Sequence, residues 1–520
     1  MIDTKKEQER EELHRAIWAI ADELRGAVDG WDFKNYVLGT MFYRYISENL
    51  VNYINTGEAE AGNDGFDYAA LSDDEAEEAR ESLVEEKGFF ILPSELFWNV
   101  LKKAPTDVNL NETLEGIFRH IEESAKGTIS EGQFAGLFDD FDVNSNKLGA
   151  TVAKRNEKLV KLLVGVANMN LGDVKNHDID AFGDAYEYLM TMYASNAGKS
   201  GGEFFTPADV SELLTRLGTV GKTEINKVYD PACGSGSLLL KAEKVLGCDA
   251  VRNGFYGQEI NITTYNLCRI NMFLHDIEFD KFDIACEDTL TNPAHWDDEP
   301  FELIVSNPPY SIKWAGDEDP LLIGDPRFSP AGVLAPRSKA DLAFIMHSLS
   351  WLASNGTAAI VCFPGIMYRG GAEQKIRKYL IDNNFIDCVI QLPANLFFGT
   401  SIATCIMVLK KNKPDSKTLF IDATSECIKV TNNNKLTSAN IQRIVDTYAQ
   451  RKEDAHFSHV ATYDEVAAND YNLSVSAYVE AEDTREQIDI VKLNAEIAQI
   501  VAREQALRDE IDKIIAEIED

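Results

Sequence analysis

The sequence has no run of apolar residues long enough to cross a bilayer, which argues against a membrane protein. Its first residues, Lys5 to Glu12, are charged and helix-favouring rather than the apolar core of a secretory signal. The eight cysteines and eight histidines show neither C-x-x-C spacing nor an H-E-x-x-H pattern, so no metal or redox site is expected. We therefore expect a cytoplasmic protein with reduced thiols.

Cationic residues are scarce relative to acidic ones. The chain has 50 lysines and arginines against 86 aspartates and glutamates, which gives a formal net charge of −36. Affinity for nucleic acid comes largely from Lys and Arg contacts to phosphates, so this balance opposes DNA binding by the chain alone. A role on DNA then requires cations concentrated in one cleft, or a basic partner subunit.

The length of 520 residues predicts about three domains rather than one core. Residues 1–165 show apolar positions at helical spacing and no catalytic constellation, so we expect a helical N-terminal domain there. Residues 166–475 contain short apolar runs that alternate with helical patterns. This alternation predicts an α/β fold with a doubly wound, Rossmann-like parallel sheet whose ligand sites lie at the carboxyl ends of its strands. The runs are NKVYD, NGFYGQEI, FELIVSNPPY, GTAAIVCFP, FIDCVIQL and TCIMVLKK.

Residues 476–520 have a different period, in which apolar residues follow alternating steps of three and four. This pattern predicts a C-terminal coiled-coil helix, interrupted by Glu504 at one expected seam position. Such a helix packs either on its own domain or against another subunit, and the pattern fits both arrangements. The seam residues are Ile490, Leu493, Ile497, Ile500, Leu507, Ile511, Ile514 and Ile518.

The segment VYDPACGSGSLLL joins an apolar strand to a helix through Gly234 and Gly236. Small residues at this position let the backbone approach a ligand at the helix N-terminus. A dinucleotide fingerprint would need a third glycine where Leu239 stands, so NAD binding is disfavoured. Asp230 precedes the loop, and a carboxylate there favours a ligand with an ammonium and a sulfonium over a pyrophosphate.

Two further acidic residues follow predicted strands. Glu259, in FYGQEI, ends the next strand, where an acid can accept hydrogen bonds from both hydroxyls of a ribose. Asp288, in CEDTL, follows the strand after that, where a carboxylate can accept a bond from the amino group of an adenine. A lone surface aspartate is the alternative explanation for Asp288, and the neighbouring motifs are what favour a binding role.

One short segment has the end of a phosphate loop. Gly198, Lys199 and Ser200 match its last three positions, but the loop also needs a glycine five positions before Gly198, where Tyr193 stands. We therefore expect that this chain does not bind ATP.

The most specific signal is Asn307-Pro308-Pro309-Tyr310, directly after the apolar run LIVS. The amino nitrogen of adenine is a poor nucleophile because its lone pair is delocalised into the ring. Two acceptors aimed at its hydrogens, the Asn307 side-chain oxygen and the Pro308 carbonyl, would make it more tetrahedral and more nucleophilic. Proline fixes the direction of that carbonyl, and Tyr310 offers an aromatic face on which a base swung out of a duplex can stack. A proline turn that merely ends a strand is the structural alternative.

The order GGEFFTP, then DPACGSG, then NPPY resembles that of the modification subunits of type I restriction-modification systems, a family of N6-adenine DNA methyltransferases. The resemblance covers nearly the whole chain and includes GVLAPRSKADLAFIMHSL, AAIVCFPGIMYRGGAEQKIRKYL and ANDYNLSVSAYV. It implies S-adenosylmethionine as the cofactor. It also implies methyl transfer to the N6 amino group of an adenine flipped out of double-stranded DNA.

The resemblance also implies roles for individual residues. Asn307, Pro308 and Tyr310 are expected to be catalytic, and Tyr310 and Phe398, in LFFGTS, to stack on the target base. Phe397 could equally be the stacking residue, and packing of both phenylalanines in the core would account for the same sequence. The residues expected to bind the cofactor are Glu203, Phe204, Phe205, Thr206, Pro207, Ala208, Asp230, Gly234, Ser235, Gly236, Ser237, Glu259 and Asp288.

Partners are implied in the same way. Modification subunits of this family are expected to act as two copies around one specificity subunit that reads the DNA sequence, and a restriction subunit can join them. The C-terminal coiled coil is then expected to dock on helices of the specificity subunit. The acidic balance of the chain is compatible with this arrangement but is not evidence for it.

Two other functions stay open from the sequence. Release-factor glutamine methyltransferases also contain NPPY, because a planar glutamine amide presents an NH₂ group much like that of adenine. Those chains are shorter and lack the GGEFFTP segment and the coiled-coil tail. The second alternative is a structural subunit that binds the cofactor without catalysis, and the intact NPPY argues against it.

Overall fold

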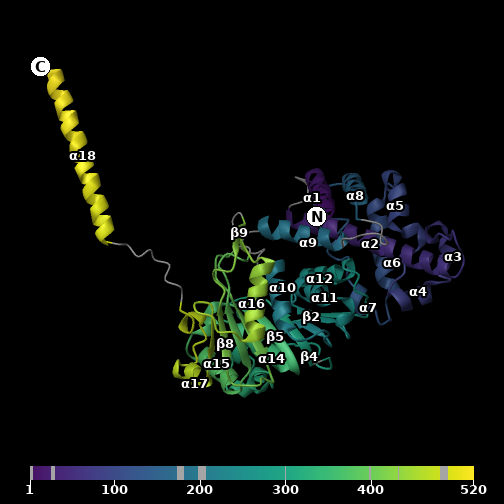
Figure 1. The fold of residues 1–520 in the computed structure, drawn as a ribbon. Coiled ribbons are helices and arrows are strands. Elements are labelled where there is room, and N and C mark those ends of the chain that lie inside the picture. The colour runs from purple at the N-terminus through teal and green to yellow at the C-terminus, as the bar shows by residue number, and fades with distance from the viewer. Residues whose placement is uncertain are drawn as a thin grey trace. The chain divides into compact units, whose positions relative to one another are not determined.

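The computed structural model describes residues 4–24, 30–171, 181–196, 206–298, 300–397, 400–430, 433–480 and 490–519. It divides into two compact units, Met1–Val479 and Glu480–Asp520 (Figure 1). No helix in these described ranges is both long and apolar enough to cross a membrane.

A nine-stranded sheet forms the centre of the first unit, with the strand order β11-β8-β6-β7-β5-β4-β1-β2-β3. Its apolar, β-branched runs are typical of strands buried on both faces. The strands are β1 (Val228–Asp230), β2 (Phe255–Glu259), β3 (Phe282–Cys286), β4 (Phe301–Ser306), β5 (Leu352–Cys362), β6 (Ile386–Gln391), β7 (Cys405–Lys410), β8 (Thr418–Asp422) and β11 (Ser458–Ala461). A separate two-stranded sheet pairs β9 (Ile428–Val430) with β10 (Asn433–Lys435).

The directions of the strands differ in part from the parallel sheet that the sequence predicts. The block from β3 through β2, β1 and β4 to β5 is parallel, as is the pair β6 and β8. Strand β7, however, is antiparallel to both of its neighbours, β5 and β6, and β11 is antiparallel to β8. An apolar run has the same pattern in either direction, so the run TCIMVLKK predicts a strand but not its orientation.

Both faces of the sheet are covered, which confirms the doubly wound α/β class. Along β4, Leu303 and Val305 belong to one hydrophobic cluster, whereas Ile304, which lies between them, belongs to another. This alternation is expected where successive side chains point to opposite faces. The helices around the sheet are α10 (Ala208–Gly218), α11 (Ser237–Leu246), α12 (Ile262–Leu274), α14 (Asp341–Trp351), α15 (Ala372–Asp382), α16 (Ser438–Gln450) and α17 (Tyr463–Ala468), with the short α13 (Pro320–Gly324) preceding α14.

The N-terminal region is helical, as the sequence predicts, and shares a core with the sheet domain. Its helices are α1 (Thr4–Leu24), α2 (Gly30–Glu60), α3 (Asp73–Glu77), α4 (Arg80–Lys87), α5 (Phe97–Lys103), α6 (Leu110–Ser124), α7 (Glu131–Phe134), α8 (Val152–Ala167) and α9 (Ala181–Asn196). The rings of Phe42 and Phe134 pack against Phe273 of α12, with centroids 5.7 and 5.0 Å away. The buried Arg269 of α12 donates to the carbonyls of Gly132 and Ala135, both at 2.9 Å. The two regions therefore fold as one compact unit.

The second unit contains the helix α18 (Ile490–Glu519), which confirms a long C-terminal helix. Its seam residues are exposed, from 43% for Leu493 to 77% for Ile518. Glu504, the one charged residue in the seam, accepts a hydrogen bond from Arg508 at 2.7 Å. A row of exposed apolar side chains at this spacing is what a coiled coil presents to a partner helix.

Candidate active site

The carboxyl ends of the parallel strands bring the predicted site residues to one edge of the sheet. Strand β1 ends at Asp230 and β2 at Glu259, while β4 is followed directly by Asn307. Because these strands run in the same direction, residues far apart in the chain become neighbours at this edge. The hydroxyl of Ser306 links two of them, since it donates to the Asp230 carboxylate at 2.7 Å immediately before Asn307.

The glycine loop between β1 and α11 needs glycine for two reasons. Gly234 and Gly236 have φ values of 54° and 80°, which lie in the left-handed region. A Cβ on Gly236 would also lie 2.8 Å from the sulfur of Cys268 and 2.9 Å from the terminal methyl of Met272, both on α12. The loop therefore fits tightly against α12, and it leaves the N-terminus of α11, which begins at Ser237, available to a ligand.

Glu259 lies against this loop, as its predicted role requires. One of its carboxylate oxygens accepts from the backbone N–H of Gly234 at 3.1 Å and the other from that of Asn261 at 2.8 Å. The residue is 9% exposed, and burial raises the pKa of its carboxyl. A carboxylate held rigidly beside a glycine loop is suited to accept hydrogen bonds from ligand hydroxyls.

Asp230 is fully buried and has one carboxylate oxygen in use. Its Oδ1 accepts from the Ala232 N–H at 3.0 Å and from the Ser306 hydroxyl, whereas Oδ2 has no hydrogen-bond partner among the residues that the structure describes. Burial raises the pKa of this carboxyl to about 7. A buried, unsatisfied carboxylate oxygen is costly, and a cationic ligand would remove that cost.

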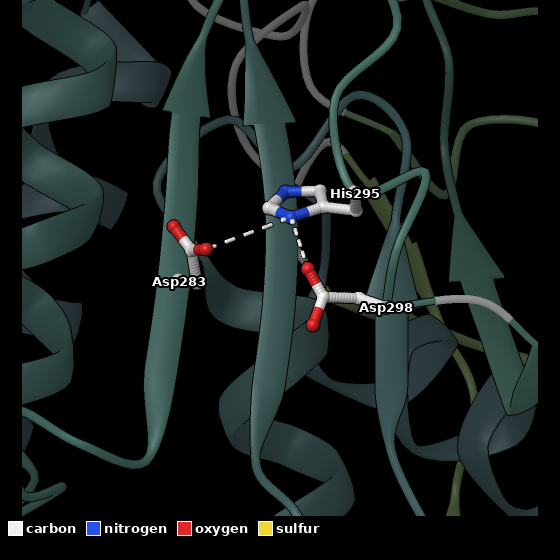
Figure 2. Close-up of side chains that lie close together, drawn as sticks. All are labelled: Asp283, His295 and Asp298. Atoms are coloured by element: carbon white, nitrogen blue, oxygen red, sulfur yellow. Dashed lines mark ion pairs between the residues drawn. The ribbon is translucent and has the colours of Figure 1, made fainter.

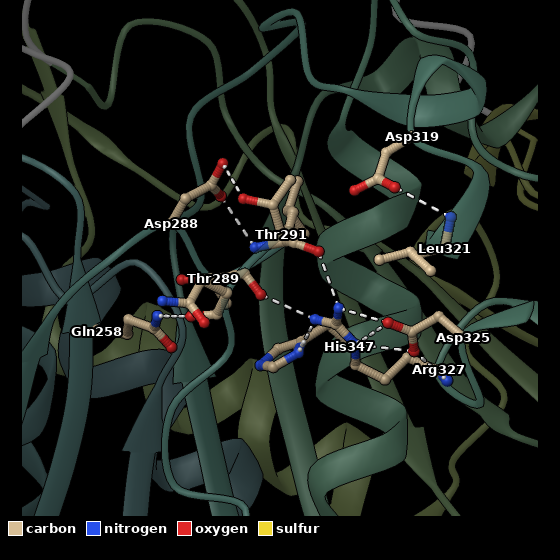
Figure 3. Close-up of polar contacts among 11 residues, drawn as sticks. Gln258, Asp288, Thr289, Thr291, Asp319, Leu321, Asp325, Arg327 and His347 are labelled. Carbon is tan, nitrogen blue, oxygen red and sulfur yellow. Dashed lines mark hydrogen bonds and ion pairs between the residues drawn. The ribbon is translucent and has the colours of Figure 1, made fainter. Parts of the chain in front are cut away.

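Asp288 occupies the turn after β3 and is held within that turn (Figure 3). Its two carboxylate oxygens accept from the Leu290 N–H and from the Thr291 hydroxyl, both at 2.9 Å. The Thr289 hydroxyl donates to the Pro231 carbonyl at 2.6 Å, which joins this turn to the glycine loop. Asp288 thus has a structural role in its own turn, at a position beside the other candidate residues.

The Asn-Pro-Pro-Tyr segment follows β4, and its polar groups are partly hydrogen-bonded to one another. The Asn307 amide donates to the Thr206 hydroxyl at 3.1 Å, and the Tyr310 hydroxyl donates to Asn307 Oδ1 at 2.5 Å. Burial holds the pKa of Tyr310 well above its usual range, so the phenol stays protonated and acts as the donor. An amide oxygen has two lone pairs, so Asn307 keeps one for a substrate. No donor among the described residues reaches the Pro308 carbonyl.

The predicted residues before α10 are described only in part. Thr206 is buried and contacts Asn307, whereas Pro207 precedes α10 and Ala208 is its first, exposed residue. Pro207 accepts the Ser211 N–H at 2.9 Å, as expected at a helix start. Glu203, Phe204 and Phe205, and the predicted base-stacking residue Phe398, lie outside the described residues.

Sequence reasoning missed three residues at this edge. Ser306 aligns the Asp230 carboxylate, and Arg327 holds the turn of Asp288. Asp341, at the start of α14, is 5% exposed and accepts the Ser311 N–H through one oxygen, while its other oxygen has no partner in the described part of the chain. Asp341 lies in the segment GVLAPRSKADLAFIMHSL, and the family resemblance of that segment is the sequence feature that points to it.

Asp283, His295 and Asp298 form a separate cluster whose possible ligand atoms lie close together (Figure 2). His295 donates through Nε2 to the Gly257 carbonyl at 3.0 Å, and its Nδ1 lies 3.5 Å from the Asp298 carboxylate and 3.7 Å from that of Asp283. The Lys227 ammonium lies 3.6 Å from the same Asp298 carboxylate. A cation at this distance disfavours a metal ion there, so we interpret the cluster as ionic contacts that hold the chain after β3 against β2.

A cavity of about 1240 Å³ lies away from this edge, near the amino end of β2. It is lined by α2, by residues of the following helices and by Phe255, the first residue of β2. Its charged lining is mainly acidic, which excludes it as the cationic cleft that DNA phosphates would need. The acidic residues are Glu58, Glu60, Glu75, Glu78, Glu86, Glu243, Asp249, Asp276 and Glu278, against Lys87, Arg252 and Lys281.

Known proteins with similar sequences and folds support one family. Residues 177–487 match the family model described as N-6 DNA Methylase, and residues 13–166 match the HsdM N-terminal domain. The chain is 50% identical to the type I restriction enzyme MpnII methylase subunit of Mycoplasma pneumoniae, over 99% of this chain and 98% of that protein. The crystal structure of a type I restriction-modification methyltransferase subunit from Streptococcus thermophilus is 35% identical and has a TM-score of 0.81, over 91% of this chain and 100% of that one.

A third protein, from a study of complex assembly and conformational transition in a type I restriction-modification system, shares the fold at 17% identity. Its TM-score is 0.64, over 98% of this chain and 99% of that one. The sheet, the glycine loop and the Asn-Pro-Pro-Tyr edge define the class of amino-methyltransferases. The chain belongs to the N-6 DNA methylase family, among the methylase subunits of type I restriction enzymes. This membership decides against a release-factor glutamine methyltransferase.

Proposed function

We propose that this chain transfers the methyl group of S-adenosylmethionine to the N6 amino group of adenine in double-stranded DNA, at sites selected by a separate specificity subunit. The observation that supports this most directly is the position of Asn307. It follows β4 directly, and the hydroxyl of the preceding residue, Ser306, donates a hydrogen bond to the buried Asp230 at the same edge of the sheet. An acceptor for the target amino group therefore lies beside residues that suit a cationic methyl donor.

The residues at the sheet edge fit S-adenosylmethionine, which supplies an electrophilic methyl group when bound. Glu259 is placed for the ribose hydroxyls, and the loop of Gly234 and Gly236 allows close approach of the ligand. The unsatisfied Oδ2 of Asp230 suits a cationic group. Ser235 and Ser237 flank the second glycine of the loop. We propose that the Asp288 carboxylate, besides its bonds within its own turn, accepts a hydrogen bond from the adenine amino group of the cofactor.

Asn307 and Pro308 are proposed to act on the target base. Their two oxygens would accept the two hydrogens of the adenine amino group and draw its lone pair out of conjugation. No N–H or O–H group among the described residues donates to the Pro308 carbonyl, and the Asn307 side-chain oxygen retains one lone pair for the base. Tyr310 would stack on one face of the flipped base once its hydroxyl no longer donates to Asn307. Phe398 would cover the opposite face of the base. Both acceptors are neutral, so the proton lost from the amino group passes to solvent.

The affinity for S-adenosylmethionine is expected to rise with pH between 6 and 8. Burial raises the pKa of Asp230 to about 7, so this carboxyl is mostly neutral at pH 6 and mostly ionised at pH 8. A cationic ligand prefers the ionised form, which predicts a roughly tenfold gain in affinity across this range. Isothermal titration calorimetry at several pH values measures it. Asp230→Asn keeps the shape and should flatten the profile, and a wild-type profile that is already flat would contradict the assignment.

The chain is proposed to work in an assembly. Two copies would flank one specificity subunit, with α18 docked on its helices, and a restriction subunit would join the full complex. Such a partner would supply the cations that this acidic chain lacks. We propose three functional parts: a helical region 1–165, a methyltransferase region 166–475 and a docking segment 476–520.

The function is tested with the complex that copurifies with this chain. Purified complex, DNA and S-adenosylmethionine labelled in the methyl group should yield label in N6-methyladenine at a defined sequence. Mapping of the methylated bases identifies both the product and the site. Label in protein glutamine, or no transfer by a complex that binds the cofactor, would refute the proposal in favour of the two alternatives.

A further inference from the structure

The side chain of Arg327 is 1% exposed and lies in the segment that follows the Asn-Pro-Pro-Tyr motif (Figure 3). Its guanidinium donates from Nε and Nη2 to the Asp325 carboxylate at distances from 2.7 to 3.1 Å. The ring of Phe328 lies 4.6 Å from it and covers one face. Burial of a charged group is costly unless all of its donors are bonded, so the N–H groups of Arg327 that Asp325 does not engage need partners elsewhere.

The remaining donors of Arg327 bind the turn that contains Asp288. Nη1 donates to the carbonyl of Thr289 and Nη2 to that of Leu290, both at 2.8 Å. These carbonyls follow Asp288 directly, and the same turn is joined to the glycine loop through Thr289. Gln258 of β2 fixes the far end of the turn, because its amide donates to the Asn292 carbonyl at 2.9 Å. The backbone beside Asp288 is thus held from three sides.

His347 completes the network on the side of β1. Arg327 Nη1 donates to His347 Nδ1 at 3.1 Å, so the ring proton lies on Nε2, which donates to the Tyr229 hydroxyl at 2.8 Å. Burial and the charge of Arg327 keep the pKa of His347 well below its usual value, so the ring is neutral. Tyr229 immediately precedes Asp230 in β1. The network therefore connects the segment after the Asn-Pro-Pro-Tyr motif with β1.

We propose that Arg327 is a positioning residue for the cofactor, which fixes the turn of Asp288 and so sets the affinity for the adenosine part of S-adenosylmethionine. The proposal rests on the cofactor site proposed above. It also links the two halves of the reaction, because Arg327 belongs to the segment that continues from the target-base motif.

The test is Arg327→Lys in the full chain. Lysine keeps the charge but cannot bond both carbonyls, His347 and Asp325 at once, so the Kd for S-adenosylmethionine is expected to rise about tenfold. The KM for the cofactor should rise with it, while the KM for DNA should change less than about twofold. Arg252→Lys is the matched control, because Arg252 is 51% exposed and its guanidinium lies 3.7 and 3.9 Å from the carboxylates of Glu224 and Glu302, outside the site.

A double-mutant cycle with Asp288→Ala identifies the route. If Arg327 acts by placing Asp288, the double variant should bind S-adenosylmethionine no more than about twofold more weakly than Asp288→Ala alone. Thr289→Val is a milder variant that removes the bond to Pro231, and it should weaken cofactor binding in the same direction, by about threefold. Full additivity in the cycle would overturn the positioning role.

A lower melting temperature with unchanged cofactor affinity in Arg327→Lys would also overturn it, because that result shows a contribution to stability alone. The wild-type chain separates this question from the proposed function. Absence of S-adenosylmethionine binding by the wild type would refute the cofactor site itself, whereas wild-type binding that Arg327→Lys leaves intact refutes only the role of Arg327.

Discussion

Replacement of Asn307 by alanine is expected to lower the rate of methyl transfer by at least about 10²–10³-fold, and to leave the affinity for S-adenosylmethionine nearly unchanged. The substitution removes the oxygen that would accept one hydrogen of the target amino group, so the lone pair of that nitrogen stays conjugated with the ring. The fall should appear in kcat, since the lost contact strengthens as the nitrogen becomes tetrahedral. Single-turnover transfer of a labelled methyl group and calorimetric cofactor binding measure the two quantities.

Two variants serve as controls for Asn307→Ala. Tyr310→Phe keeps the aromatic face and removes only the hydroxyl that donates to Asn307, so it should keep most of the activity. Thr206→Val removes the hydroxyl that accepts from the Asn307 amide, and its effect shows how much of the loss comes from a misplaced amide. If Asn307→Ala loses cofactor binding to the same degree as activity, the catalytic assignment is wrong and the residue has a structural role.

Lysine at two seam positions of α18, Leu507→Lys with Ile511→Lys, is expected to abolish assembly with the other subunits. The two side chains are 54% and 55% exposed in the chain, and in a coiled coil they would be buried as knobs in the holes of a partner helix. A buried, unpaired ammonium costs more than such an interface can offset. Size-exclusion chromatography of the coexpressed subunits measures assembly, and site-specific methylation should be lost with it.

The control for the seam is Ala506→Lys, which adds the same side chain to the same turn of α18 but outside the seam. Alanine and lysine have similar helix propensities, so the helix itself should be unaffected. Normal assembly of Ala506→Lys and failure of the seam variant would assign docking to the seam. Both variants should still bind S-adenosylmethionine, because the compact unit Met1–Val479 contains every proposed cofactor residue.

Much of the fold follows from local patterns in the sequence. The apolar runs predicted for β1, β2, β4, β5, β6 and β7 are all strands, since a buried strand needs several consecutive apolar residues. The sequence does not predict β9, whose three residues are exposed, or the small sheet that it forms. The reversed direction of β7 was also beyond prediction, because strand direction depends on the chain connections and not on the residues of the strand.

The site divides in the same way. Asp230 and Glu259 end their strands, Asn307 directly follows β4, and Gly234 lies in the loop after β1, so their meeting at one edge follows from the parallel order. Arg327 gave no such signal, because its partners Thr289 and His347 are 38 and 20 residues away and only the folded chain brings them together. The sequence does not distinguish a buried arginine from an exposed one, so the environment of Arg327 is known only from the folded structure.

The close fit of α12 between two neighbours has a mechanical consequence. On one side, Cys268 and Met272 would clash with any side chain at Gly236, and the Asn271 amide donates to the Ser235 carbonyl at 2.7 Å. On the other, Arg269 is clamped by carbonyls of the helical region. Because α12 contacts both the N-terminal helices and the glycine loop, we expect a displacement of those helices to be passed through α12 to the glycine loop. A protein that binds to the N-terminal helices is then expected to change the affinity of the chain for the methyl donor.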